Sequence, residues 1–229
     1  MKTVVIIQAR VTSTRLPAKV LQMLGDQPVL AHVIDRAKMI EGASSVWCAF
    51  PDDMNAVKLQ RIALEKDVAS YLGSEKDVLE RYARCAEHAQ ADVVVRITAD
   101  CPLIDPKVCA DVIKLRDREF APYASNVWPR SFPHGLDCEV FTMDVLAKAH
   151  KEATDEYDRE HVTPWIIRNS RRVNLPSGYF NLARHRWTID YIEDLSFMQR
   201  LFALGNPQSM QETLALIAAN PSLQRRVAV

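Results

Sequence analysis

The sequence lacks an excess of either charge and lacks any long apolar run. It has 29 lysines and arginines against 29 aspartates and glutamates, so its formal net charge is zero. Electrostatic nucleic-acid binders carry a basic excess, and we expect no nucleic-acid partner. No apolar run approaches the ~18–20 residues of a membrane helix, and Gln8 and Arg10 interrupt the first apolar residues too soon for a signal peptide. We therefore expect no membrane partner and a cytoplasmic location.

Several chemical motifs are missing as well. The five cysteines form no C-x-x-C pair, which is typical of reduced thiols in a cytoplasmic protein. Neither G-x-x-x-x-G-K-[ST] nor G-x-G occurs, so the chain has neither a P-loop nor a dinucleotide-binding fingerprint. No internal repeat or low-complexity block divides the sequence. We expect one domain over residues 1–229.

The apolar residues alternate between strand and helix patterns. Runs typical of buried strands cover residues 4–7, 46–50, 68–71 and 93–97, and apolar residues at helical spacing follow each of them. This alternation predicts an α/β fold with a mostly parallel sheet and helices on both faces. Five prolines punctuate residues 122–180, which we expect to form a small irregular insertion carrying substrate and dimer contacts.

The last part of the chain returns to a regular pattern. Residues 186–190 read R-W-T-I-D and predict a strand that ends in an acid. Helical spacing follows over residues 192–204 and 210–219. We therefore expect residues 206–229 to form a helical tail.

A cationic segment, Q-A-R-V-T-S-T-R-L-P-A-K over residues 8–19, directly follows the first predicted strand. It contains Arg10, Arg15, Lys19 and three hydroxyl residues but no acid, and the first acid in the chain is Asp26. In open α/β sheets ligands bind at the carboxyl ends of the strands. Backbone N–H groups, a helix N-terminus and guanidinium groups can together bind a polyphosphate. The segment predicts a triphosphate-binding loop, and the alternative is a solvated basic loop.

Two acids, Asp100 and Asp190, also follow predicted strands. We expect both at the same sheet edge as the cationic segment, where carboxylates beside a polyphosphate can hold Mg²⁺. The alternative for Asp100 is a turn or helix-capping aspartate, which suits Asp105 before Pro106 better. The sequence thus predicts a metal–triphosphate site with Asp100 and Asp190 as metal ligands and Mg²⁺ as cofactor.

Five motifs occur in order between residue 3 and about residue 204: Q-A-R-V-T-S-T-R-L-P-A-K, R-I-T-A-D-C-P-L-I-D, F-P-H-G-L-D-C-E-V-F, R-E-H-V-T-P and R-W-T-I-D-Y-I-E-D-L. Together they resemble the cytidylyltransferases, which include the CMP-Kdo and CMP-sialic acid synthetases. The match is closest to the branch called spore coat polysaccharide biosynthesis protein F. The resemblance implies a GT-A-like, Rossmann-like fold, and attack of a nucleophile on the α-phosphorus of CTP with release of pyrophosphate.

The resemblance also implies roles for individual residues. The nucleotide-binding set would be Ala9, Arg10, Ser13, Arg15, Lys19, Ser74, Arg81 and Asp100. The catalytic set would be Lys19, Arg15, Asp100 and Asp190. Within the first set, Ser74 and Arg81 are the candidates for the base and ribose side. Thr12 and Ala18 stand where the branch usually has glycine, so each adds a side chain where backbone would approach phosphate.

The acceptor side is implied by two further motifs. The residues expected to face the acceptor are His134, Asp137, Glu139, Glu160 and His161. His134 stands where the branch usually has an acid, and Glu160–His161 has a simple helix-capping or pairing role as its alternative. Asp137, Glu139 and His161 are candidate general bases, although a metal-assisted reaction requires none.

These observations lead to one expected function and three alternatives. We expect Mg²⁺-dependent transfer of CMP from CTP to a sugar or sugar acid, for surface polysaccharide synthesis, by a homodimer. The first alternative keeps the chemistry but uses a phosphonate or polyol phosphate as acceptor. The second is a GT-A glycosyltransferase, which would need a D-x-D motif that is absent after the strand at Asp100. The third is a non-catalytic nucleotide-binding or scaffold protein.

Overall fold

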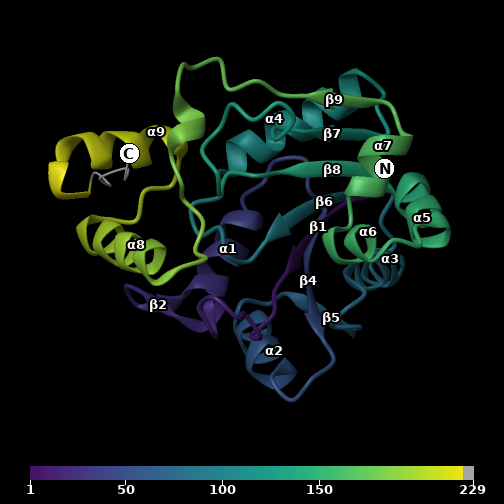
Figure 1. Cartoon of the computed structure of the whole chain (residues 1–229), viewed down its shortest axis with the longest axis horizontal. Helices are drawn as coiled ribbons and strands as arrows, with labels where there is room; N and C mark the ends of the chain where they lie inside the picture. The colour runs from purple at the N-terminus through teal and green to yellow at the C-terminus, as the bar shows by residue number, and fades with distance from the viewer. Residues whose placement is uncertain (224–229) are drawn as a thin grey trace.

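The computed structural model describes residues 1–223, and in them the chain builds a seven-stranded sheet (Figure 1). The order across the sheet is β5-β4-β1-β6-β8-β7-β9. The strands are β1 (Thr3–Gln8), β4 (Ser45–Pro51), β5 (Ala69–Gly73), β6 (Val93–Thr98), β7 (Tyr123–Ser125), β8 (Glu139–Thr142) and β9 (Arg172–Asn174). Only β8 among these strands runs antiparallel to its neighbours. The predicted mostly parallel α/β sheet is confirmed.

Helices cover both faces of the sheet. One face packs against α1 (Val29–Ala37), α2 (Ala56–Glu65) and α4 (Pro106–Arg118). The other packs against α3 (Val78–His88), α5 (Met143–Glu152) and α7 (Pro164–Asn169), with the short α6 (Glu156–His161) beside α3. A hairpin of β2 (Met23–Leu24) and β3 (Gln27–Pro28) precedes α1.

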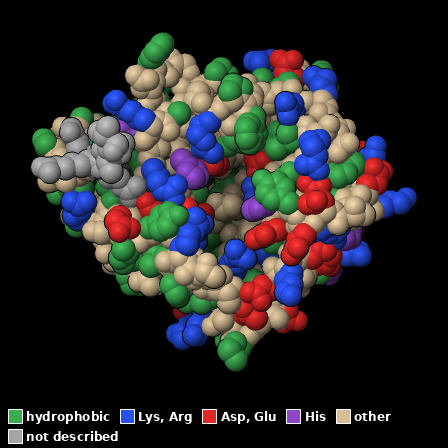
Figure 2. Space-filling model, viewed as in Figure 1, with side chains coloured by type: hydrophobic (Ala, Val, Ile, Leu, Met, Phe, Trp, Pro, Cys, Tyr) green, Lys and Arg blue, Asp and Glu red, His purple; other side chains and the backbone are tan. Residues whose placement is uncertain are grey.

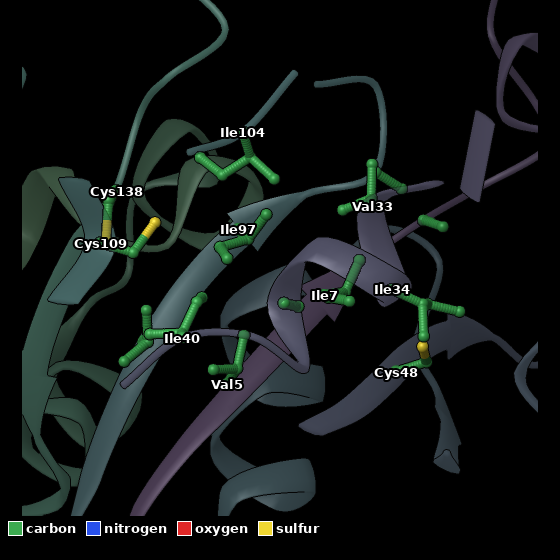
Figure 3. Packing of buried hydrophobic residues seen from close by; sticks show 14 of the residues in the cluster. Val5, Ile7, Val33, Ile34, Ile40, Cys48, Ile97, Ile104, Cys109 and Cys138 are labelled. Atoms are coloured by element: carbon green, nitrogen blue, oxygen red, sulfur yellow. The ribbon is translucent and has the colours of Figure 1, made fainter. Parts of the chain in front are cut away.

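The residues of β1 show why this sheet is buried on both sides. Successive side chains of a strand point to opposite faces. Val5 and Ile7 therefore join the cluster under α1, where Figure 3 shows both among residues that include Ile34 and Ile40, while Val4 and Ile6 join the cluster under α3. All five cysteines are buried and free, and three of them belong to the cluster of Figure 3. They act there as small apolar side chains.

Two helices begin with side-chain caps, and the second of these caps, Asp105, confirms the role expected for it from the sequence. The Asp77 carboxylate accepts a hydrogen bond from the Glu80 backbone N–H at the start of α3 (2.9 Å). The Asp105 carboxylate accepts from the Lys107 backbone N–H (2.8 Å), with Pro106 as the first residue of α4. Asp105 is thus the capping aspartate of this region, and Asp100 is free for another role.

Residues 122–180 differ from the expected irregular insertion. They supply β7, β8 and β9, which extend the main sheet, together with α5, α6 and α7. The strands have only three or four residues each, too few to show a repeating pattern in the sequence. The register between β6 and β8 then places Glu139 opposite Arg96.

The predicted strand at residues 186–190 is wrong. In the structure this segment makes one isolated bridge, between Arg186 and His134, and does not join the seven-stranded sheet. Its apolar residues Trp187 and Ile189 are buried in a third cluster with α8 (Ile192–Leu204) and α9 (Met210–Ala219). The apolar run reflects this burial, which a strand pattern cannot distinguish from a sheet.

The helices predicted over 192–204 and 210–219 are confirmed as α8 and α9, which lie together at the left of Figure 1. Three short 3₁₀ helices complete the described chain: η1 (Lys19–Leu21), η2 (Leu182–Arg184) and η3 (Pro221–Leu223). The end of the expected helical tail, residues 224–229, lies outside the described residues. No helix within residues 1–223 is long and apolar enough to cross a membrane.

Candidate active site

A cavity of about 270 Å³ lies at the carboxyl ends of β1 and β6. Its wall consists of Asp190, residues 98–100 and most of residues 8–20, including the predicted Ala9, Arg10, Ser13, Arg15 and Lys19. Figure 2 shows a hollow near the centre of the visible face, with basic, acidic and histidine side chains around it. The chain thus gathers the cationic segment and both predicted metal ligands around one space.

The cationic segment has a compact loop shape before η1. The backbone N–H groups of Ser13 and Ala18 both donate to the Val11 carbonyl, each at 3.0 Å. Ala18 adopts a left-handed conformation with φ of 53°. Glycine adopts this conformation without strain, which gives a physical reason for glycine at this position in the resembled branch. The Thr12 hydroxyl donates to Glu75 at 2.6 Å and so ties the loop to the segment before α3.

Lys19 lies between the two acids. Its ammonium Nζ is 2.6 Å from Asp100 Oδ2 and 2.9 Å from Asp190 Oδ1. Arg15 contacts the same Asp190 oxygen at 3.1 Å, and Arg186 contacts the other at 2.5 Å. Burial opposes the charge of Lys19, but the two carboxylates outweigh it and raise the pKa of Lys19. Burial likewise opposes ionisation of Asp190, but Lys19 and Arg186 outweigh it and lower the pKa of Asp190. Lys19 and Asp190 are therefore both charged at neutral pH.

The two acids fit a divalent cation in the position that Lys19 now reaches. Both carboxylates contact one cationic nitrogen, so a single metal ion there would be within reach of both. In residues 1–223 no group of three or more His, Cys, Asp or Glu side chains could hold a metal ion. Mg²⁺ is commonly held by one or two carboxylates with substrate phosphates and water completing its shell. The donor set therefore fits Mg²⁺ bound together with a nucleotide.

Tertiary hydrogen bonds bring Asp190 to Asp100. The Ile189 backbone N–H donates to the Asp100 carbonyl at 2.9 Å, and the Thr188 hydroxyl donates to the same carbonyl at 3.3 Å. These bonds fix residues 188–190 against the loop after β6. The strand-end position inferred for Asp190 was wrong, but its side chain does reach the predicted place.

Ser74 and Arg81 are not part of the cavity wall. The Ser74 hydroxyl accepts from the Asp77 backbone N–H (3.0 Å), and an Arg81 guanidinium N–H donates to the Ser74 carbonyl. Arg81 is fully buried, and its Nε and Nη2 have no hydrogen-bond partner among the described residues. Burial lowers its pKa. Buried donors without partners are costly, and neither nitrogen faces the cavity in this structure.

A second cavity of about 780 Å³ adjoins the first, because Thr98 lines both. Of the residues predicted to face the acceptor, Asp137, Glu139 and His161 line this cavity, whereas His134 and Glu160 do not. Four arginines also line it, on β6, β9, α7 and the loop before β8: Arg96, Arg130, Arg168 and Arg172. No local pattern singles out these arginines, because they lie in separate segments that only the fold brings together.

The predicted acceptor residues have different surroundings. Asp137 accepts two hydrogen bonds from Arg130, at 2.5 and 2.8 Å. Glu139 is 6% exposed, and its oxygens accept from Arg96 and from the Tyr123 hydroxyl (2.7 Å). The carboxylate of Glu139 is thus already engaged inside the protein, which disfavours it as a general base.

The three remaining residues predicted to face the acceptor are His161, Glu160 and His134. The His161 ring packs on the Tyr157 ring with centroids 4.3 Å apart. Glu160 forms an ion pair with Arg10 at 3.8 Å, between α6 and the cationic segment. His134 Nδ1 lies 3.0 Å from an Arg186 nitrogen, and burial lowers the pKa of His134, so its imidazole is neutral at pH 7. His134 does not line the larger cavity itself, but its Nε2 lies 3.8 Å from Oδ2 of Asp137, which does.

Comparison with known proteins agrees with this geometry. Residues 4–215 match the family model described as cytidylyltransferase. The chain belongs to the cytidylyltransferase family. It is 27% identical to the spore coat polysaccharide biosynthesis protein SpsF of Bacillus subtilis, over 94% of each chain. It is 35% identical to the 3-deoxy-manno-octulosonate cytidylyltransferase of Tolumonas auensis, over 96% of this chain and 91% of that protein.

A solved structure shows the same fold. The cytidylyltransferase from Leptospira borgpetersenii is 30% identical and gives a TM-score of 0.93, covering 100% of this chain and 99% of the other. The family and the fold class expected from the sequence are confirmed. As a cytidylyltransferase, the protein is a nucleotidyltransferase enzyme. This family assignment argues against both the non-catalytic and the glycosyltransferase alternatives.

Proposed function

We propose that this cytidylyltransferase transfers CMP from CTP to a sugar or sugar acid, with Mg²⁺ as cofactor and release of pyrophosphate, in surface polysaccharide synthesis. The observation that carries the proposal is the Lys19 ammonium bound by Asp100 and Asp190 in a cationic cavity that adjoins a second, larger one. The first cavity has the charges that a triphosphate and its metal need. The second has room for an acceptor beside it.

The reaction forms one bond and breaks one bond at the α-phosphorus. An acceptor hydroxyl oxygen attacks that phosphorus and loses its proton to water, the bond to the bridging oxygen of the β-phosphate breaks, and pyrophosphate leaves with the electron pair. Asp100 and Asp190 would hold Mg²⁺, which polarises the α-phosphate and lowers the pKa of the acceptor hydroxyl. Lys19, Arg15 and Arg10 line the cavity where the triphosphate would lie, and their charges offset the charge that develops on the leaving group.

Lys19 would change partners when the nucleotide binds. In the structure it is bonded to the two carboxylates that would hold the metal. If these carboxylates held a divalent cation, the Lys19 ammonium group would be free to bond phosphate oxygens in the same cavity.

An acidic acceptor suits the larger cavity. Arg172 lines it and is exposed to solvent. Arg130 and Arg168 also line it, and they are paired with Asp137 and Asp158. Guanidinium groups bind carboxylates and phosphates with paired hydrogen bonds. The support for a sugar acid over a phosphonate or polyol phosphate is the 3-deoxy-manno-octulosonate named for the Tolumonas relative. The homodimer expected from the resemblance remains a prediction, which light scattering of the purified protein tests.

The test measures pyrophosphate release with Mg²⁺, each of the four ribonucleoside triphosphates, and a panel of acidic sugars, neutral sugars, polyol phosphates and phosphonates. We expect release with CTP and an acidic sugar, and a CMP-linked product by mass spectrometry. Asp100→Asn should abolish turnover, whereas Asp111→Asn, which removes an exposed Lys–Asp pair at 2.7 Å on α4, should not. If pyrophosphate is released only with a phosphonate or a polyol phosphate, that compound class replaces the sugar acid as the proposed acceptor. No release with any mixture, in protein that binds CTP, would refute the transfer reaction.

A further inference from the structure

Asp190 reaches the cavity from a segment that no sheet supports. Residues 186–190 make one isolated bridge and lie outside the seven-stranded sheet. A metal ligand must nevertheless keep its carboxylate in a fixed orientation, because metal affinity depends on the groups that hold the ligands. Asp100, in contrast, lies two residues after the end of β6.

Arg186 supplies the missing support through three different contacts. Its Nη2 donates to Asp190 Oδ2 at 2.5 Å, and its Nε donates to Asp194 Oδ1 at 3.2 Å. Its Nη1 donates to His134 Nδ1 at 3.0 Å, the neutral tautomer of His134 having Nδ1 free to accept. All three nitrogens of the guanidinium group are thus bonded, which fixes the plane of the group.

Asp194 completes the arrangement from the first turn of α8. It is 2% exposed, and its Oδ2 accepts from the backbone N–H groups of Asp190 (2.8 Å) and Tyr191 (3.0 Å). Asp194 therefore holds both the backbone of Asp190 and the arginine that bonds the Asp190 side chain. The Asp190 oxygen that faces Arg186 is Oδ2, which leaves Oδ1 directed to Lys19 and Arg15 in the cavity.

We propose that Arg186 is a positioning residue for the metal site: held by Asp194 and His134, it fixes the Asp190 carboxylate so that one oxygen faces the metal. This inference rests on the proposed function, because it assumes that Asp190 binds the metal. It also gives His134 a role different from the acceptor contact expected from the sequence. The loop that carries His134 is itself fixed on this segment, since the His134 carbonyl accepts from the Trp187 backbone N–H at 2.6 Å.

The test replaces Arg186 with a residue that keeps the positive charge but lacks the planar guanidinium group. Arg186→Lys retains a cation near Asp190 but cannot make the three directed contacts. With CTP present, we expect its Kd for Mn²⁺, measured from the EPR signal of free Mn²⁺, to rise 10- to 100-fold, the range for outer groups that orient metal ligands. Arg184→Lys, at an exposed position two residues earlier, is the matched control and should leave the Kd within twofold. Thermal unfolding of each variant is measured alongside.

A second variant keeps the test decisive if Arg186→Lys fails to fold. His134→Ala removes one of the three acceptors at a partly exposed position, and we expect a smaller rise in Kd, about 3- to 10-fold. A Kd for Mn²⁺ unchanged in both Arg186→Lys and His134→Ala, or shifted equally by Arg184→Lys, overturns the positioning role. If the unsubstituted protein with CTP binds no Mn²⁺, it is the metal assignment of the proposed function that fails.

Discussion

The contact of Lys19 with both acids predicts opposite effects of one substitution on metal binding and on turnover. Lys19→Met removes the cation that now bonds Asp100 at 2.6 Å and Asp190 at 2.9 Å. In the unsubstituted protein a divalent cation must displace this ammonium group before it reaches the carboxylates. In the variant the carboxylates are open, so Mn²⁺ should bind more tightly without nucleotide.

The size of the effect follows from the bonds that are lost. A hydrogen bond to a charged group contributes ~1.5–3 kcal/mol, and Lys19 makes two. The side chains of Lys19, Asp100 and Asp190 are 11, 21 and 13% exposed, so we reduce the sum for solvent screening to ~2 kcal/mol, which corresponds to about 30-fold in Kd. Turnover should fall by ~10²–10³, because the charge that offsets the leaving pyrophosphate is gone.

The assay is an EPR titration of free Mn²⁺ without nucleotide, paired with the rate of pyrophosphate release from CTP. Lys114→Met is the matched control, because Lys114 pairs with Glu41 at 2.6 Å on the exposed surface far from the cavity. That control should change neither quantity. A Kd for Mn²⁺ that is unchanged or weaker in Lys19→Met, in protein that unfolds at the same temperature as the parent, would refute competition between Lys19 and the metal.

Three further outcomes are expected. Gly135→Ala should lower the free energy of unfolding by ~2–4 kcal/mol in a denaturant titration, because Gly135 has φ of 112° and a Cβ there would lie 2.5 Å from the Trp187 carbonyl. The control is Gly178→Ala, which has φ of 73° and open space around it and should lower the free energy of unfolding by only ~1 kcal/mol. The pKa of Asp190 is lowered in the folded protein, so its ionised carboxylate stabilises the fold above its ordinary pKa of 3.8 and this contribution is lost as pH falls through the lower folded value. Asp190→Asn should therefore melt below the parent at pH 7 and approach it at pH 3, and a constant gap would contradict this account. Arg81→Met removes the hydrogen bond from Arg81 to the Ser74 carbonyl, together with two buried N–H groups that have no partner. It should weaken CTP binding in calorimetry because the Ser74 segment loses this anchor, while the melting temperature of the nucleotide-free protein changes little because the lost bond and the removed unpaired donors offset each other.

The sequence identified the parallel half of the sheet and the cationic segment because both are local patterns. Val4 to Ile7 form a buried strand whose type is evident from four adjacent residues, and Arg10, Arg15 and Lys19 lie within ten positions of one another. The loop after β1 must lie at the carboxyl edge of such a sheet, so the position of the cations followed from the strand.

The acceptor side was much harder to predict. The short strands β7, β8 and β9 have no recognisable period, and residues 122–180 therefore resembled an irregular insertion. The pairing of Glu139 with Arg96 depends on the antiparallel register of β8, which no local signal specifies. A carboxylate expected to face the acceptor is consequently engaged inside the protein.

By itself, the sequence determined which charges this protein brings to a triphosphate and where along the chain they lie. Only the tertiary structure decided how the second acid is held. Residues 186–190 resemble a strand because Trp187 and Ile189 are buried, yet they pack against α8 and α9 and are fixed by bonds to Asp100, His134 and Asp194. Apolar patterning records that a residue is buried, but it contains no information on which distant group receives its hydrogen bonds. The position of Asp190 beside Lys19 is therefore a property of the folded chain.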